Sequence, residues 1–406
     1  MKPKRKDNCI DMSKPKEHLK YSDNKLNYGR ELDYVLLTAV LLLSGFGVVV
    51  MSSAMQNAST GGGDSMFIRH TVLLGVGVAI AFILAAFDYK EYKFFGIFMY
   101  LISTVMLVLV KLFGHGESAW GANNWLNIPG LGSFQPSEIA KITFIMMSAV
   151  FLSRIKDGVG NKWIQMLKLA IYAAIPIGLI LIQPDVGTAL VFVFILGIMI
   201  FAFGVKYRYV GLLAVLGSAA AWGAWNFFLN ELRKDRIRAF LDPQAYDPEG
   251  LGSAYQINRS LMTIGSGGAT GKGLYQGLNT QNNLVPVKES DFILTVVGEE
   301  FGYIGCILVL ALLLIIIIRC FMVAKKAKDS YGSLLAAGVA GMIGFHFIEN
   351  VGMCIGLMPI TGIPLPFVSY GSSAMLTNFI AVGIVLSVAM RRRKRQFEAE
   401  NEKVLS

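Results

Sequence analysis

Long apolar runs separated by short polar segments recur along almost the whole chain. Each run is close to the roughly 17–25 residues that one α-helix needs to cross a bilayer. A transmembrane β-barrel would instead show short segments in which polar and apolar residues alternate. The pattern therefore predicts an all-α polytopic membrane protein with about ten transmembrane helices. We place these helices near residues 33–53, 70–87, 93–113, 136–153, 164–182, 186–204, 208–228, 291–318, 333–357 and 374–390.

The composition supports a membrane protein and changes how the net charge is interpreted. Of the 406 residues, 54% are hydrophobic and 16% are charged, whereas a soluble domain carries about 25% charged residues. The net charge of +10 could suggest a nucleic-acid-binding protein, but Lys and Arg gather between the apolar runs and at the chain ends. We therefore expect contact with membrane lipid and no nucleic-acid partner.

The basic clusters predict the orientation of the chain, because Lys and Arg concentrate in cytoplasmic loops. With residue 1 in the cytoplasm, all the basic clusters fall on the cytoplasmic side, and an even number of helices places both termini there. We expect cytoplasmic basic tails at residues 1–32 and 391–406 and a transmembrane domain at 33–390. A large extracytoplasmic loop then covers about 229–290, between the seventh and eighth helices.

Within this large loop, the segment GSGGATGKG (265–273) has a composition typical of a phosphate-binding loop. It does not match the pattern G-x-x-x-x-G-K-[ST], because residue 266 is Ser and residue 273 is Gly. Two interpretations stay open. The glycines can supply the left-handed backbone of a turn, or the backbone amides can cradle a lipid phosphate.

Two other outer segments carry charged residues at helix starts. QPSEIAK (135–141) places a proline and Glu138 in the first helical turn, where both are favoured. Lys141 shares a helix face with Glu138 and can either pair with it or meet a substrate anion near the outer surface. Asp185, in the segment QPDVGT, can cap the following helix or line a polar cavity.

The segment SDFILTVVGEE (290–300) sets three carboxylates at and inside the outer end of the eighth helix. A charged side chain at the centre of a membrane helix costs roughly 2.5–3.5 kcal/mol on insertion scales, so such residues indicate a functional site. Asp291 stands at the start of the helix, where it could also be a plain N-cap. Glu299 lies about 12 Å deeper, and we expect Glu299, with Glu300, to line a polar cavity beneath Asp291.

The order of these motifs resembles that of a known family. QPSEIAK, QPDVGTALVF, GSGGATGKGLYQG, SDFILTVVGEEFGYIG and PITGIPLPFVSYGSSAMLT follow one another as in SEDS proteins, the family of RodA, FtsW and SpoVE. The resemblance covers roughly residues 33–390, and the wording is most like that of RodA. It implies ten membrane helices with both termini cytoplasmic, in a multi-pass protein of the bacterial cytoplasmic membrane.

The resemblance also implies a function. RodA and FtsW are peptidoglycan glycosyltransferases that polymerise lipid II at the outer face of the membrane and work with a class B penicillin-binding protein, in cell elongation or division. The essential aspartate of the family falls on Asp291, and the tryptophan of another motif falls on Trp125. This chain departs from the usual family pattern at Asn124, Val287, Glu289 and Ser372.

A mechanism follows for lipid II and the undecaprenyl-linked glycan. Asp291 is the expected general base, which takes a proton from the attacking sugar hydroxyl. One displacement at the anomeric carbon inverts its configuration and needs no covalent sugar–enzyme intermediate. A cation then stabilises the departing pyrophosphate. The cations that we consider are Lys141, Arg259, Lys272, Lys288 and a divalent ion, Mg²⁺ or Mn²⁺, whose ligands the sequence does not identify.

The same reasoning and resemblance give a wider set of residues expected to bind substrate or line a cavity. Besides the lysines at 141, 272 and 288, this set contains Trp125, Gln135, Glu138, Asp185, Glu299, Asn350, Ser369 and Tyr370.

Two other functions stay open at this point. A lipid II flippase would also use intramembrane carboxylates, but its main site should lie near the membrane midplane. A non-catalytic scaffold for a penicillin-binding protein would tolerate the loss of Asp291.

Overall fold

The computed structural model describes residues 31–56, 63–114, 124–128, 132–204 and 253–392, together with residues 223, 226, 234, 237–238 and 240–247. The predicted tails therefore fall almost entirely outside the described residues. The same holds for most of the predicted helix at 208–228 and for part of the predicted loop at 229–290.

Nine long α-helices within the described ranges coincide with nine of the predicted spans. They are α2 (Tyr34–Gln56), α3 (Gly63–Ala86), α4 (Tyr92–Phe113), α6 (Pro136–Lys156), α7 (Lys162–Ile182), α8 (Val186–Phe203), α14 (Ile293–Lys326), α15 (Ser330–Cys354) and α16 (Ser372–Met390). Eight of them are long and apolar enough to cross a membrane. The ninth, α6, carries Glu138 and Lys141 in its first turns. The predicted all-helical polytopic fold is confirmed for this part of the chain.

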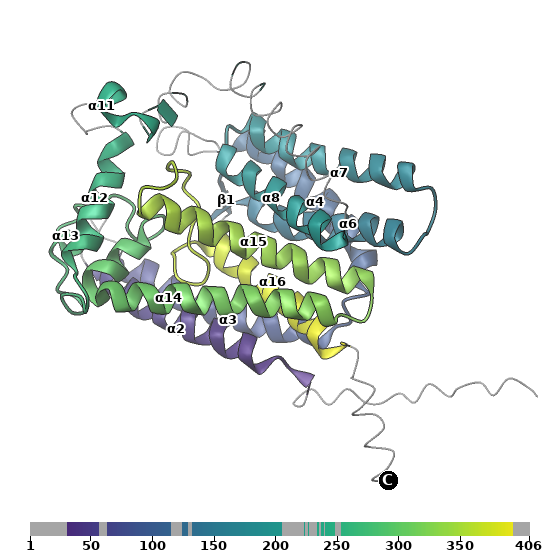
Figure 1. Ribbon diagram of the computed structural model, residues 1–406, viewed down its shortest axis with the longest axis horizontal. Helices are drawn as coiled ribbons and strands as arrows, with labels where there is room; N and C mark the ends of the chain where they lie inside the picture. The colour runs from purple at the N-terminus through teal and green to yellow at the C-terminus, as the bar shows by residue number, and fades with distance from the viewer. Residues whose placement is uncertain are drawn as a thin grey trace, which may run out of the picture.

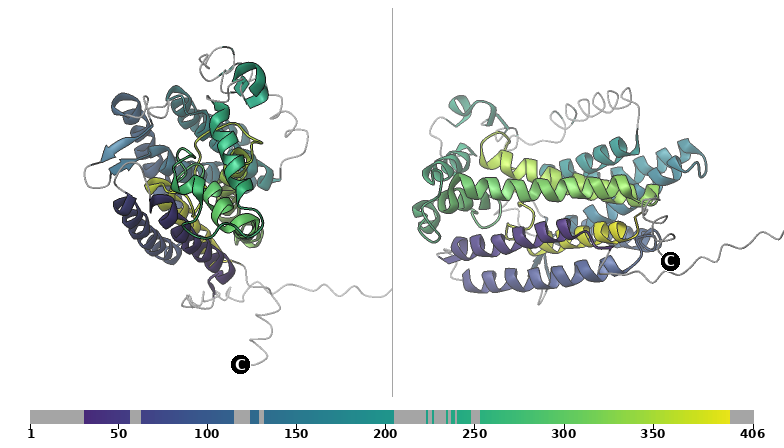
Figure 2. Two further views of the ribbon diagram at one scale, coloured as in Figure 1. Left: turned by 90° about the vertical axis from the view of Figure 1, so that its left-hand side faces the viewer. Right: turned by 60° about the horizontal axis from the view of Figure 1, so that its bottom comes forward.

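Shorter elements gather at one end of the bundle. The strands β1 (Leu126–Ile128) and β2 (Gly132–Phe134) form a small antiparallel hairpin between α4 and α6, with Leu126 opposite Phe134. Between α8 and α14, the chain forms the short helices α11 (Pro243–Tyr246) and α13 (Leu278–Gln281) and the longer helix α12 (Ser253–Ser266). Figures 1 and 2 show α11, α12 and α13 together beyond the ends of the long helices.

The helices α15 and α16 form the centre of the bundle. Most of their residues are buried, whereas only a small share of α3 and α4 is buried. α15 packs against α6, α8, α14 and α16, and Figure 1 shows it lying along α14. Its middle is rich in small residues, from Ala336 to Gly341. Small residues allow membrane helices to approach closely, which explains how one helix can contact so many others.

Contacts at the two ends of the bundle agree with the predicted division of the loops. One end joins residues of the segments expected in the cytoplasm, through the pairs Arg319–Asp33 (2.6 Å), Tyr89–Asp329 (3.1 Å), Ser330–Asp157 (2.8 Å) and Arg391–Asp88 (3.6 Å). The other end joins residues of the outer segments, through Asn124–Asp185 (2.8 Å), Gln135–Ser373 (2.9 Å) and Ser53–Glu300 (2.5 Å).

The helix α14 is broken near its outer end. Gly302 has φ 66° and ψ −163°, a conformation that is essentially restricted to glycine. It divides α14 into an outer part, 293–301, and a long inner part, 303–326. A break of this kind leaves backbone carbonyls and amides without helical partners, and those groups need partners from elsewhere in the chain.

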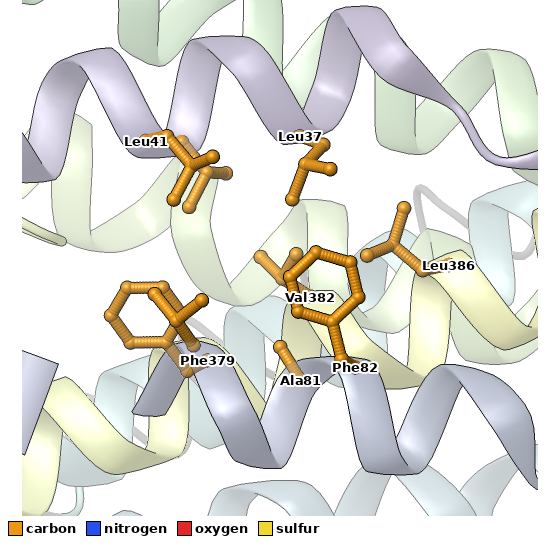
Figure 3. Close-up of a pocket in the computed structure, with 9 residues that line it drawn as sticks. Leu37, Leu41, Ala81, Phe82, Phe379, Val382 and Leu386 are labelled. Atoms are coloured by element: carbon orange, nitrogen blue, oxygen red, sulfur yellow. The ribbon is translucent and has the colours of Figure 1, made fainter. Parts of the chain in front are cut away.

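An apolar crevice lies between α2, α3 and α16. Figure 3 shows Leu37 and Leu41 facing Ala81, Phe82, Phe379, Val382 and Leu386 across it. Its lining contains no polar side chain, so this crevice does not provide groups for acid–base chemistry.

Candidate functional site

The segment 265–273, here called the glycine loop, fills the break in α14. Four backbone hydrogen bonds join them: Lys272 N to Glu299 O (2.9 Å), Gly273 N to Glu300 O (3.1 Å), Tyr303 N to Gly268 O (2.9 Å) and Ile304 N to Ala269 O (3.1 Å). Gly271 has φ 81°, and a Cβ there would collide with the Glu300 carbonyl. The structure thus favours the turn interpretation of this segment, because helix carbonyls occupy the amides that could have cradled a phosphate.

Glu299 ties the glycine loop and α13 to α14. Its carboxylate is fully buried and accepts hydrogen bonds from Lys272 Nζ (2.7 Å), Asn279 N (3.0 Å), Asn279 Nδ2 (3.1 Å), Thr280 N (2.8 Å) and Thr280 Oγ1 (2.8 Å). Both oxygens are therefore engaged by the outer loop. The structure gives Glu299 an anchoring role in place of the expected lining of a polar cavity.

Glu300 anchors the same region to α2. Its carboxylate accepts hydrogen bonds from Ser53 Oγ (2.5 Å) and Gln281 Nε2 (3.3 Å) and is also buried. Ser53 comes from the outer end of α2 and Gln281 from α13. The two adjacent carboxylates thus both hold α13, Glu299 together with the glycine loop and Glu300 together with α2. These donors offset part of the cost of burying the two charges.

Asp291 lies in a tight turn just before α14. The Val287 carbonyl accepts hydrogen bonds from Ser290 N (3.2 Å) and Phe292 N (3.3 Å). Val287 has φ 54°, which is strained for a β-branched residue. The helix begins at Ile293 without a side-chain cap, so Asp291 is not an N-cap. Its Oδ1 instead accepts a hydrogen bond from Ser290 Oγ (2.9 Å).

Asn350 on α15 fixes the backbone of this turn. Its Nδ2 donates to Asp291 O and to Ile363 O, both at 2.8 Å. Asn350 is fully buried. One amide group therefore links the Asp291 turn to the segment 358–371, which follows α15, and sets the position of the Asp291 backbone.

The segment 358–371 also binds the backbone of the Asp291 turn. Ser369 Oγ donates to Ser290 O (2.6 Å), and Tyr370 N donates to Glu289 O (2.8 Å). Three predicted residues, Asn350, Ser369 and Tyr370, are thus brought together with Asp291, and they act on backbone atoms of its turn.

The second carboxylate oxygen of Asp291 is available for chemistry. Among the residues that the structure describes, none donates a hydrogen bond to Oδ2. Gly362 lies beside it, and a Cβ on that glycine would stand 3.4 Å from Oδ2, so the glycine keeps space next to this oxygen. Asp291 is partly exposed as a residue, although the surrounding protein desolvates its carboxylate.

The surroundings of Asp291 favour its protonated form more than water does. The pKa of Asp291 is raised to about 6, mainly because burial desolvates the carboxylate; the Ser290 hydrogen bond opposes this shift, and the Glu289 charge adds a smaller contribution to it. A carboxyl group with a pKa closer to neutral is a stronger base than an ordinary aspartate, and such values cluster at functional sites.

Three of the expected cations are engaged inside the protein. Lys141 is buried and contacts Glu138 Oε1 (2.8 Å) and His346 Nε2 (3.0 Å). Lys272 forms an ion pair with Glu299. Lys288 is buried and donates to the Thr280 carbonyl, and burial lowers the pKa of its ammonium group. Of the two interpretations of Lys141, the structure supports pairing with Glu138.

The remaining predicted residues lie at the same end of the bundle but serve local structure. Asp185 caps α8 by accepting a hydrogen bond from Thr188 N (3.0 Å), and its other carboxylate oxygen accepts one from Asn124 Nδ2 (2.8 Å). Trp125 follows Asn124 and is half-buried at the start of the β1–β2 hairpin. The backbone N–H of Gln135 donates a hydrogen bond to Ser373 Oγ (2.9 Å). None of these described contacts joins them to the Asp291 carboxylate.

Three contacts near the site were not predicted from the sequence: His346 with Lys141, Ser290 with Asp291, and the pair Asn279 and Thr280 with Glu299. His346 stands four residues before Asn350 on α15, so both lie on one helix face, and this spacing could have indicated its place. The role of Asn279 and Thr280 had no such signal, because it depends on a contact with Glu299 across about twenty residues of loop.

The described residues contain no group of three or more His, Cys, Asp or Glu side chains that could hold a metal ion. The protein groups around Asp291 in this part of the chain therefore do not form a metal site by themselves.

Comparison with known proteins places the chain among peptidoglycan enzymes. A family model described as "Cell cycle protein", which covers FtsW, RodA and SpoVE, matches residues 33–394. The chain is 34% identical to "Probable peptidoglycan glycosyltransferase FtsW" of Trichlorobacter lovleyi, over 88% of this chain and 93% of that protein. It is 32% identical to "Peptidoglycan glycosyltransferase MrdB" of Escherichia coli K12, over 89% and 95%.

Solved structures give the same result. One similar chain comes from a structure titled "Structural coordination of polymerization and crosslinking by a peptidoglycan synthase complex", with a TM-score of 0.73, 28% identity, and coverage of 90% of this chain and 99% of that one. The rod shape determining protein RodA of Thermus thermophilus has a TM-score of 0.65 and 27% identity, over 90% and 98% of the two chains.

Proposed function

This chain belongs to the FtsW, RodA and SpoVE family of cell cycle proteins, and on that premise we propose that it is a peptidoglycan glycosyltransferase. It polymerises lipid II into glycan strands at the outer face of the cytoplasmic membrane, in cell elongation or division. The names of its relatives support the activity. The observation that carries the site is the Asp291 carboxylate, held by its backbone at the outer end of the bundle, whose Oδ2 accepts no hydrogen bond from the described residues.

Asp291 acts as the general base of the transfer. Its Oδ2 takes the proton of the acceptor sugar hydroxyl while that oxygen attacks the anomeric carbon of the donor. The bond from this carbon to the pyrophosphate oxygen breaks, and undecaprenyl pyrophosphate leaves with the bonding electrons. The configuration inverts in this one step. A base with a pKa of about 6 is deprotonated at neutral pH and still basic enough to accept the proton.

The fixed backbone around Asp291 supports this role. Asn350 and Ser369 hold the carbonyls of Asp291 and Ser290, and Ser290 Oγ orients Oδ1. Asp291 Oδ2, which accepts no hydrogen bond from the described residues, is therefore held in one orientation before the substrate binds. Holding a reacting group in position contributes to catalysis by removing the entropy cost of orienting it during the reaction.

The leaving pyrophosphate needs a positive charge, and Arg259 is the available candidate among the four that the sequence suggested. Its guanidinium lies 5.3 Å from the ring centre of Tyr255, and it forms no ion pair with another described residue. Lys141, Lys272 and Lys288 are bound to groups of the protein itself. We propose that Arg259, on the outer helix α12, contacts the pyrophosphate.

A divalent cation, Mg²⁺ or Mn²⁺, stays part of the proposal. Magnesium often binds through substrate phosphates and only one or two carboxylates. Since the described residues offer no larger cluster of ligands, the pyrophosphate oxygens would supply most of its coordination. When bound, the ion would add positive charge at the leaving group. Removal of the ion with EDTA, followed by addition of Mg²⁺ or Mn²⁺, tests this point.

A penicillin-binding partner of class B is also proposed. The support is that a similar chain was solved within a peptidoglycan synthase complex whose title names polymerisation and crosslinking. Such a partner would crosslink the strands that this chain polymerises.

The test is a lipid II polymerisation assay with full-length protein, the candidate partner and Mn²⁺ or Mg²⁺. Wild type is compared with Asp291→Asn, which keeps the shape of the side chain but removes the base. We expect the variant to lose about 100-fold or more of the rate, as for general-base catalysis. Glu289→Gln, a neighbouring carboxylate in the same turn, is the matched control and should remain active.

Each outcome separates the possible functions. Polymer from wild type and Glu289→Gln but not from a folded Asp291→Asn supports the proposal. Equal polymer from all three proteins would exclude Asp291 as the base while leaving the enzyme assignment intact. No polymer from any of them, with the partner present, would favour a flippase or a scaffold, and lipid II transport into vesicles would then be measured.

A further inference from the structure

A groove opens between α4, α6 and α7, near the end of the bundle opposite Asp291. These three helices pack on one another, and Figure 1 shows them side by side. The groove has a volume of about 310 Å³, which is at the lower end of the range for small-molecule sites. Its floor contains Met147 and Phe151, which are buried, and its rim contains Phe94 and Ile97, which are exposed. An apolar groove with an exposed rim on membrane helices suits a hydrocarbon chain.

The lining of this groove also carries three positive charges and no carboxylate. They are Lys93 from α4, Arg154 from α6 and Lys168 from α7. All three side chains are exposed. In the described part of the chain, the side chains of Arg154 and Lys168 form no hydrogen bond or ion pair, and Lys93 Nζ lies 4.6 Å from the ring centre of Tyr331. Each of the three helices therefore contributes one positive charge to the same stretch of the groove, and no carboxylate of the lining neutralises them.

The charges lie where lipid phosphates are found. Lys93 is the second residue of α4, and Arg154 is two residues from the end of α6. Lys168 lies six residues into α7, about 9 Å along the helix axis. The two headgroup layers together add about 10–15 Å to a hydrocarbon core of about 30 Å. A lysine at that depth reaches the boundary between headgroups and hydrocarbon, and the predicted orientation makes this the cytoplasmic leaflet.

We propose that this groove binds one anionic phospholipid of the cytoplasmic leaflet. Its phosphate lies among Lys93, Arg154 and Lys168, and one acyl chain follows the apolar floor over Met147 and Phe151. Tyr172, one turn after Lys168 on α7, supplies the only hydroxyl group of the lining. Charge complementarity selects an anionic lipid, because a zwitterionic headgroup would bring its own cation into the cluster. Basic pockets between helices on the cytoplasmic side bind anionic headgroups in this way.

The site differs from the proposed catalytic site in its location and in its ligand. It involves helix ends at the cytoplasmic side, and none of its residues contacts the Asp291 turn. Loss of lipid binding and loss of polymerisation can therefore be told apart in separate assays.

The experiment uses full-length protein in detergent with added phosphatidylglycerol or phosphatidylcholine, and native mass spectrometry measures the bound fraction. The double variant Arg154→Gln/Lys168→Gln removes two of the three charges. We expect about fivefold weaker phosphatidylglycerol binding for each charge removed, thus roughly 25-fold for the pair. Lys156→Gln/Lys162→Gln is the matched control, because it removes two charges from the same helix ends outside the groove.

Equal phosphatidylglycerol binding by wild type and Arg154→Gln/Lys168→Gln would overturn the proposal. The same holds if phosphatidylcholine binds as tightly as phosphatidylglycerol, or if the control loses as much affinity as the groove variant. A second measurement needs no variant. Photoactivatable phosphatidylglycerol should crosslink to wild-type peptides from α4, α6 and α7, and crosslinks confined to other helices would overturn the assignment.

Discussion

The contact between Glu299 and the outer loop makes a quantitative prediction for the variant Glu299→Gln. The carboxylate uses both oxygens: one accepts from Thr280 N and Oγ1, and the other from Lys272 Nζ, Asn279 N and Asn279 Nδ2. Glutamine has the same shape but replaces one oxygen with an NH₂ group. In either orientation this NH₂ faces a backbone N–H, so two donors oppose each other inside the protein.

The cost follows from these contacts. A buried donor without an acceptor costs about 1–3 kcal/mol. The orientation that keeps an oxygen toward Lys272 and Asn279 is the cheaper one, and it leaves the Thr280 amide without an acceptor. The variant also loses the negative charge opposite Lys272, a contact worth less because the Lys272 side chain is 28% exposed. Together we expect a loss of about 1–4 kcal/mol in the free energy of holding the glycine loop and α13 on α14.

Two measurements check this value on protein purified in detergent. The thermal unfolding midpoint should fall, and trypsin should cut faster after Lys272, because that residue is released from Glu299. Glu349→Gln is the matched control, since Glu349 is also buried but has one described side-chain donor, Thr361 Oγ1 at 2.8 Å. An unchanged midpoint together with unchanged cleavage after Lys272 would refute the reasoning.

Three further predictions concern the site and the break in α14. The polymerisation rate should rise with pH through a midpoint near the Asp291 pKa of about 6, because only the ionised carboxylate accepts a proton. At pH 5 the rate should be about one tenth of its plateau value. Glu289→Gln should shift the midpoint of this pH–rate profile to lower pH, because it removes a charge that raises the Asp291 pKa. Asn350→Leu removes the amide donor of two carbonyls and leaves only the weak Cys354 thiol on one of them. We therefore expect a loss of about 2–4 kcal/mol in stability, seen as a lower thermal midpoint, and a slower polymerisation rate. Gly302→Ala forces a Cβ against the Gly271 amide and should lower the free energy of unfolding by about 1–3 kcal/mol, seen as a lower thermal midpoint. The control Gly344→Ala should be close to neutral, because its Cβ would meet no atom within 4 Å.

Hydrophobic pattern predicted the helices well because burial in lipid requires a long apolar run. Its errors lie at helix ends. The second helix was expected from residue 70 and begins at Gly63, and the eighth was expected to end at 318 and extends to Lys326. A helix does not stop where the hydrocarbon ends, since polar residues continue it into the headgroups and water. Hydropathy therefore locates the membrane-crossing part and not the helix boundary.

The site was predictable only in part. The motif resemblance placed Asp291, and the structure gathers Asn350, Ser369 and Tyr370 around its turn. The break at Gly302 was not predictable, because hydropathy does not report backbone dihedral angles and the apolar run resumes directly after Glu299 and Glu300. The partner of Glu299 was not predictable either, because Lys272 and Asn279 reach it only after the loop has folded.

The break in α14 also affects how the chain is inserted into the membrane during synthesis. The part after the break, residues 303–326, measures about 36 Å at 1.5 Å per residue, which exceeds a hydrocarbon core of about 30 Å. This part can therefore enter the bilayer as a complete segment by itself. Glu299 and Glu300 precede it, so insertion does not require either carboxylate to pass into lipid. The donors to both side chains, among them Lys272 for Glu299 and Ser53 and Gln281 for Glu300, precede α14 in the chain. They are therefore made before α14 emerges from the ribosome and can bind both carboxylates as soon as the segment is in place.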